Sequence, residues 1–207
     1  MPATAKKLSE AKGLALHVPK EKPYPLSVDQ YHAMIEAGIL GEDEPVELLE
    51  GRLVTKMPKK PAHPLAKRRL RRYLSRLLPK GYFFDSQDPI TTADSEPEPN
   101  GIVVHGDEDD FVDRHPGPAE VVLAAEVSES SLRTDRGSKK RLYARARIPV
   151  YWIINLVDRQ VEVFSLPAGI GKDPDYRKRQ VFKPGDDVPV VIRGRTVGRI
   201  PVRNLLP

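Results

Sequence analysis

The chain has 207 residues, enough for one domain with a sizeable hydrophobic core and a short tail. Its hydrophobic content of 39% and charged content of 30% are ordinary for a soluble globular protein. The absence of cysteine excludes disulfides and thiolate metal sites, and it favours a reducing compartment. No apolar run approaches the roughly 20 residues that span a bilayer, so we expect a cytoplasmic protein without a membrane partner.

The net charge of +5 is distributed unevenly along the chain. Every charged residue from Gly51 to Phe84 is Lys or Arg, and every one from Asp85 to Asp113 is Asp or Glu. This segregation predicts a basic surface near an acidic site, although both runs could equally face solvent.

The N-terminal part is predicted to contain a tail, two helices and a hairpin. Residues 1–26 lack periodicity and indicate a flexible basic tail, so the folded domain is expected over 27–207. A Ser-x-x-Gln capping box opens a predicted helix over 27–40, and residues 46–54 predict two paired extended segments. Residues 63–78 carry one apolar stripe, with Lys and Arg over the rest, and predict an amphipathic helix.

Strands predominate in the rest of the chain, with one polar helix among them. The predicted strands are residues 82–85, 89–92, 101–105, 121–128, 150–156 and 160–166, followed by further short strands, and the predicted helix spans about 134–146. This order predicts an α/β protein of mixed α+β type with one central sheet.

Glu126 is unusual because it lies inside VVLAAEV, a run that is apolar on both faces and predicts a central strand. An unpaired carboxylate there would be costly unless it were hydrogen-bonded, paired or bound to metal. The alternative is that Glu126 points into water at a frayed strand end. Lys139 lies on an otherwise packed face of the next helix and can project toward Glu126. Its alternative is a surface ion pair with Asp135, and Lys140 is expected to face solvent.

Asn100 precedes the predicted strand 101–105, at a position where an aspartate would make chemical sense. Two carboxylates on neighbouring strands can hold Mg²⁺ through oxygen ligands. The metal would activate a water and neutralise charge on a phosphate, and a lysine would stabilise the transition state. The ordered set therefore indicates metal-dependent hydrolysis of a phosphate ester.

The sequence resembles the Uma-type restriction endonuclease family, a bacterial branch of the PD-(D/E)XK nuclease superfamily. The resemblance runs from about Ser27 to the C-terminus. It implies a restriction-endonuclease-like central mixed sheet flanked by helices, Mg²⁺-dependent hydrolysis of DNA, and a homodimer as one assembly. The matching stretches are SVDQYHAMIEAGIL, VELLEGRLV followed by His63, SEPEPN and AAEVSESSLRTDRGSKKRLYARARIPVYWIINL.

The resemblance assigns the family glutamate to Glu126 and the family lysine, displaced onto the following helix, to Lys139. A further family glutamate falls on Glu47, which the resemblance implies as an additional residue of the site. The alternative is that Glu47 is an exposed strand residue. The family histidine falls on His63, which is equally well a helix-entry residue. The family aspartate falls on Asn100, which keeps a carbonyl oxygen but loses the negative charge. The resemblance therefore implies a catalytic and metal-binding set of Glu126, Lys139, Asn100 and Glu47 that is weakened at one position.

The leading hypothesis is a Mg²⁺-dependent DNA endonuclease with impaired catalysis. Arg68, Arg71 and Arg72, together with the Arg-rich helix 133–147, are expected to contact DNA phosphates without reading sequence. One alternative is a catalytically inactive nucleic-acid-binding protein of the same fold. Another is a protein whose basic faces meet a protein partner.

Overall fold

The computed structural model of the chain describes residues 23–41, 44–58, 60–86, 88–169, 171 and 173–207. Residues 1–22 of the predicted tail over 1–26 therefore lie outside the described residues. Its last part contacts the domain, because the backbone N–H of Leu26 donates to the carbonyl of Gly51 at 2.8 Å.

The described part of the chain contains both helices and strands. The first elements are α1 (Val28–Glu36), β1 (Val46–Leu49), β2 (Arg52–Thr55), α2 (Ala62–Ser75), β3 (Tyr82–Asp85), β4 (Gly101–His105) and the 3₁₀ turn η2 (Glu108–Phe111). They are followed by β5 (Val121–Ser128), α3 (Leu132–Thr134), the π-helical turn η3 (Asp135–Lys139), α4 (Lys140–Arg145) and β6 (Val150–Asn155). The chain ends with β7 (Gln160–Ala168), β8 (Asp175–Phe182), β9 (Asp187–Ile192), β10 (Arg195–Pro201) and α5 (Val202–Leu205).

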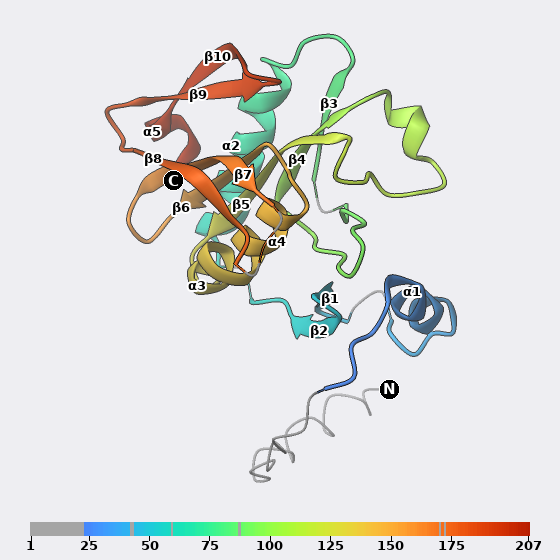
Figure 1. The fold of residues 1–207 in the computed structure, drawn as a ribbon. Coiled ribbons are helices and arrows are strands. Elements are labelled where there is room, and N and C mark those ends of the chain that lie inside the picture. The colour runs from blue at the N-terminus through green and yellow to red at the C-terminus, as the bar shows by residue number, and fades with distance from the viewer. Residues whose placement is uncertain (1–22, 42–43, 59, 87, 170, 172) are drawn as a thin grey trace, which may run out of the picture.

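A six-stranded mixed sheet of order β3-β4-β5-β6-β7-β8 forms the centre of the fold (Figure 1). β5 and β6 are parallel and the other neighbours are antiparallel. Parallel neighbours need a crossover, and the α3–η3–α4 segment supplies it. Both central strands are buried along their whole length, as their apolar runs predict. The structure therefore confirms the predicted mixed α+β fold.

Each face of the sheet has its own hydrophobic cluster. On one face α2, α5 and the β9–β10 hairpin cover residues that include Val103, Trp152 and Ile154. On the other face α4 packs Leu142 and Tyr143 against the sheet. Since α2 buries Ala66, Leu70 and Leu74 at intervals of four residues, its Lys and Arg residues are left on the outside, as predicted.

Two predicted elements differ in the structure. Residues 89–92 form no strand, because their backbone groups bond to loop carbonyls. Ile90 donates to Pro97 and Thr91 to Pro116, and a proline has no N–H with which to return the bond of a strand ladder. The helix predicted over 134–146 begins earlier and contains the π-helical turn η3 between two α-helical pieces.

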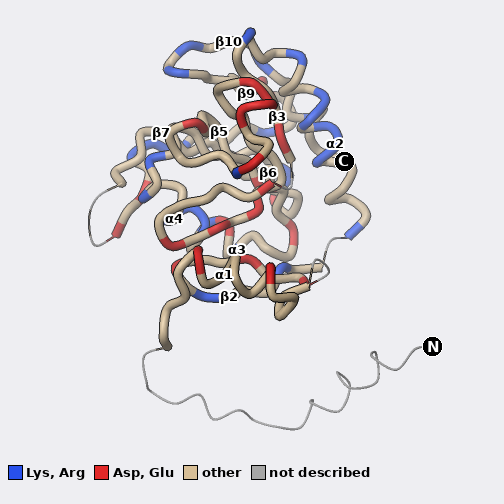
Figure 2. Tube along the Cα trace, turned by 90° about the vertical axis from the view of Figure 1, so that its right-hand side faces the viewer, with Lys and Arg blue, Asp and Glu red and all other residues tan. Residues whose placement is uncertain are grey.

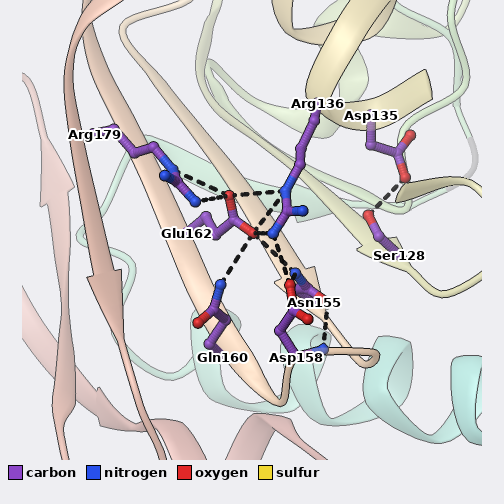
Figure 3. A network of polar contacts seen from close by, with 8 residues as sticks. All are labelled: Ser128, Asp135, Arg136, Asn155, Asp158, Gln160, Glu162 and Arg179. Atoms are coloured by element: carbon purple, nitrogen blue, oxygen red, sulfur yellow. Dashed lines mark hydrogen bonds and ion pairs between the residues drawn. The ribbon is translucent and has the colours of Figure 1, made fainter. Parts of the chain in front are cut away.

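A network around Glu162 of β7 ties the crossover segment to the sheet (Figure 3). Glu162 is fully buried and accepts hydrogen bonds from Arg136 of η3, Arg179 of β8 and Asn155 of β6. Although burial raises the pKa of a carboxyl, these donors outweigh it and lower the pKa of Glu162 from 4.5 to about 2. The network therefore holds η3 against β7 by a charged contact.

We predict that Glu162→Gln lowers the free energy of unfolding by about 2 kcal/mol at neutral pH, because it removes a buried charge with two cationic partners. The ionised carboxylate stabilises the fold fully above its unfolded pKa of about 4.5, and this contribution is lost as pH falls through about 2. Urea unfolding at neutral pH and near pH 3 should thus show a smaller difference between the variant and the natural chain in acid. Glu36→Gln on exposed α1 is the control and should change little.

Candidate active site

Side chains from four parts of the chain meet in a pocket of about 260 Å³. Glu47 comes from β1, Asn100 from the bend before β4, Glu126 from β5 and Lys139 from η3. All four are at least nine-tenths buried. The structure therefore brings together the four residues that the sequence singled out, although three of the four parts are far apart in the chain.

Glu126 is buried among hydrogen-bond donors, so the alternative of a frayed strand end in water is wrong. Its Oε1 accepts from Lys139 Nζ at 2.9 Å and from the Tyr143 hydroxyl at 3.1 Å, and its Oε2 accepts from the backbone N–H of Asn100 at 3.3 Å. The last contact confirms that Asn100 and Glu126 lie side by side across the β4–β5 pair, where Gly101 is opposite Ala125.

Lys139 bridges two carboxylates, because its Nζ also lies 3.1 Å from Glu47 Oε2. The alternative of a surface pair with Asp135 is wrong. Asp135 is itself buried, and its carboxylate accepts hydrogen bonds from the hydroxyls of Ser128 and Ser131, each at 2.6 Å. The π-helical turn carries both side chains inward.

Lys140 points away from the pocket, as expected, but it does not simply face solvent. Its Nζ pairs with Asp175 at 2.8 Å and lies 5.6 Å from the centre of the Phe164 ring. The preference for Lys139 over Lys140 as the lysine facing Glu126 is confirmed.

Buried charges of both signs line the pocket. Burial raises the pKa of Glu126 to about 7, against the opposing effect of Lys139. Burial alone lowers the pKa of Lys139, but the carboxylates of Glu126 and Glu47 outweigh it, so the pKa lies above its ordinary value. Lys139 is therefore an ammonium at neutral pH, and the buried carboxyl of Glu126 holds its proton more readily than a free glutamate does.

The amide of Asn100 connects three elements. Its Oδ1 accepts the backbone N–H of Val127 in β5 at 2.7 Å and lies 3.2 Å from Nε2 of His63, in the first turn of α2. His63 lies at the start of α2 and also lines the pocket, so its position fits both a helix-entry residue and a site residue. The amide oxygen is engaged by protein donors on two sides.

Glu47 is buried, so the alternative of an exposed strand residue is wrong. Its Oε2 also accepts the backbone N–H of Glu98 at 3.1 Å. Glu98 lines the same pocket, but its carboxylate pairs with Lys56 at 2.7 Å. The hydrogen bond from the Tyr143 hydroxyl to Glu126 is a feature that the sequence analysis missed. The signal was present, because Tyr143 follows Lys139 by four residues on the same packed face.

Glu126 and Glu47 are the candidate oxygen ligands for a metal ion in the pocket. Among the residues that the structure describes, no three His, Asp or Glu side chains are placed to hold a metal together. Mg²⁺, however, is commonly bound by one or two carboxylates and keeps several waters. Glu126 and Glu47 supply such a pair, but Lys139 competes for both, and the Asn100 oxygen already accepts a backbone hydrogen bond.

The predicted DNA-contacting arginines lie outside this pocket. Arg68 and Arg72 are exposed on α2. Arg71 lines a separate groove of about 1090 Å³, together with Asp85 and Asp88. That larger groove contains none of the four pocket residues.

Comparison with known proteins gives a family and a fold. A family model described as "Uma2: Putative restriction endonuclease" matches residues 28–199. The chain belongs to the Uma2 family. A solved structure titled as a "putative nuclease belonging to DUF820" from Anabaena variabilis has a TM-score of 0.66 at 16% identity, over 87% of this chain and 97% of that one. At this identity the likeness shows a shared fold. No curated protein matches the Uma2 chain.

The sequence predicts that no segment spans a membrane. None of the helices in the described ranges is long and apolar enough to cross a bilayer.

We predict that Lys139→Met lowers the free energy of unfolding by about 3 kcal/mol near pH 8, because it leaves Glu47 and Glu126 buried without a counter-charge. Lys140→Met is the matched control. It removes the same charge from an exposed pair with Asp175 and should cost less than about 1 kcal/mol. Equal losses in urea unfolding would contradict the assignment of Lys139 as the counter-charge.

Proposed function

We propose that this Uma2-family chain is a metal-dependent DNA endonuclease that hydrolyses phosphodiester bonds, and that Asn100 weakens its catalysis. The observation that carries the proposal is a buried ammonium bridging two buried carboxylates in an open-mouthed pocket. Structural ion pairs also occur in cores, but this one lines a cavity and lies in a chain of an endonuclease family.

Glu126 and Glu47 would hold Mg²⁺, which when bound polarises a water molecule and neutralises charge on the phosphate. Lys139 stays protonated because its pKa is raised, so it serves as a fixed positive charge for the phosphate oxygens and not as a general base. Tyr143 donates to Glu126 Oε1 and leaves Oε2 toward Asn100, and it thereby orients the carboxylate.

Asn100 limits this chemistry by charge. With an amide at position 100, the ammonium of Lys139 offsets one of the two carboxylates, which leaves this pair with one net negative charge to attract a dication. A carboxylate in the same place would add a full charge next to Glu126.

The second candidate is a nucleic-acid-binding protein that keeps this fold without catalysis. One observation favours it: the Asn100 oxygen takes part in holding β5 and α2 together, which is a structural role that needs no metal. Both candidates have DNA as the partner, and we place both in the cytoplasm, which the lack of cysteine favours. A homodimer remains a prediction of the family resemblance.

We predict weak or absent nicking of supercoiled plasmid by the natural chain at millimolar Mg²⁺, and an increase of about tenfold or more for Asn100→Asp, equivalent to at least about 1.4 kcal/mol of transition-state stabilisation. An aspartate can still accept the hydrogen bonds from Val127 and His63, so the fold should be kept. Glu126→Gln in the Asn100→Asp background should abolish the gain.

Lys140→Met in the same background is the control and should leave nicking unchanged. Strong cleavage by the natural chain that does not rise in Asn100→Asp would contradict the limiting role of Asn100. A complete lack of metal-dependent cleavage by both, with DNA binding intact, would favour the second candidate.

A further inference from the structure

The basic side chains of this protein fall into two groups that differ in pairing. Most cations of the η3–α4 segment are held by carboxylates. Arg136 pairs with Glu162 and Asp158, Arg141 with Glu50, and Arg145 with Asp94. Their charge is neutralised within the protein, which leaves this segment a poor source of the phosphate contacts that its sequence predicted.

The second group has no such partners. Within the described part of the chain, no carboxylate pairs with Arg68 or Arg72 of α2 or with Arg76, the residue that ends it. The three are exposed and lie at intervals of four residues. The same holds for Arg193 and Arg195 at the tip of the β9–β10 hairpin. Figure 2 shows Lys and Arg on α2 and on this hairpin. These charges are available to a polyanion.

The hairpin is fixed beside the end of α2. Gly198 of β10 lies so close to Leu77 that an added Cβ would come within 2.6 Å of its Cδ2. Val188, Val190 and Ile200 of the hairpin belong to the same hydrophobic cluster as α2. The guanidinium of Arg193 lies 6.0 Å from the centre of the Tyr82 ring in β3. The hairpin charges therefore keep a set position relative to the α2 row.

The turn of the hairpin places an arginine where backbone geometry disfavours it. Arg193 and Gly194 link Ile192 to Arg195 and both have positive φ, 47° and 78°, as in a type I′ turn. Asn and Gly are the residues suited to the first of these positions, whereas an arginine there is strained. Arg193 is one of five non-glycine residues with positive φ in the described part of the chain, and its guanidinium at the hairpin tip has no carboxylate partner.

We propose that the tip of the β9–β10 hairpin is a second phosphate-binding surface, which continues the arginine row of α2 and contacts the backbone of duplex DNA away from the cleavage pocket. α2 starts at the pocket with His63, and its 14 residues span about 20 Å, or about six base-pair steps of 3.4 Å. The hairpin tip would thus contact phosphates more than about six base-pair steps away from the phosphodiester bond that is cleaved in the pocket. This inference rests on the proposed function only in taking DNA as the partner.

The test measures binding of the full chain to a fluorescent 24-base-pair duplex in EDTA, over a series of salt concentrations. Arg193→Asn with Arg195→Gln should lower the log–log salt slope by about 1.8, two phosphates at about 0.9 each, and should weaken binding at least about fivefold at 100 mM salt. Because Asn suits the turn, this variant should be as stable as the natural chain or more so, which separates binding from folding.

Arg177→Gln with Lys178→Gln is the matched control. It removes two exposed charges from β8, at the edge of the sheet opposite β3, and should leave affinity and slope nearly unchanged. Since the chain has no cysteine, Thr196→Cys and Gln180→Cys each supply a single thiol for a photo-cross-linker. The first, beside the tip, should cross-link to the duplex, and the second, on β8, should not.

Unchanged binding in the tip variant, an equal loss in the β8 control, or the absence of duplex binding by the natural chain would each overturn the proposal. Preference of the tip for single-stranded RNA or an acidic protein would do the same. The endonuclease proposal is judged separately by the nicking of Asn100→Asp. If Asn100→Asp nicks DNA but the tip variant binds DNA normally, only the endonuclease proposal stands. If the tip variant binds DNA more weakly but no nicking is seen, only the proposed DNA-binding surface stands.

Discussion

The buried ammonium of Lys139 is the contact on which the rest of this structure depends. It lies between Glu126 of the central sheet and Glu47 of a hairpin that belongs to a separate two-stranded sheet. Two carboxylates can be buried together only with a counter-charge, and a lysine on a rigid helix supplies it. One side chain thus joins the hairpin, the sheet and the crossover helix. The pocket exists because these three parts meet there.

The placement of Lys139 depends in turn on the π-helical turn. Asp135 and Lys139 are both buried, and Arg136 between them reaches Glu162 on β7. The wider turn is anchored on two sides, by Ser128 at Asp135 and by Glu162 at Arg136 (Figure 3). Ser131 also donates to Asp135. A π-helical turn within an α-helix is often found at a functional site, and here it directs the lysine toward its partners.

Periodicity and local signals were sufficient to predict most of the fold and to single out Glu126, Lys139 and Asn100, whereas Glu47 was assigned by the family resemblance alone. The capping box of α1, the stripe of α2 and the apolar runs of β5 and β6 depend on neighbours in the chain, so the sequence carries them. The π-helical turn, the loop over 89–92 and the neutralisation of Arg136 depend on partners far away in sequence. No local pattern encodes those partners, which is why the charged helix 133–147 was expected to contact DNA while its charges are internally paired.

Asn100 has one more property, which follows from its neighbour. Gly101 comes next, and a glycine leaves its backbone nitrogen open to attack the side-chain amide of a preceding asparagine, with loss of ammonia and later uptake of water. The product includes aspartate, the residue that the pocket lacks. In the folded chain the amide is buried and held by Val127 and His63, so the reaction needs local opening of the β4–β5 pair. The packing of the β4–β5 pair therefore protects the identity of residue 100 as well as its position.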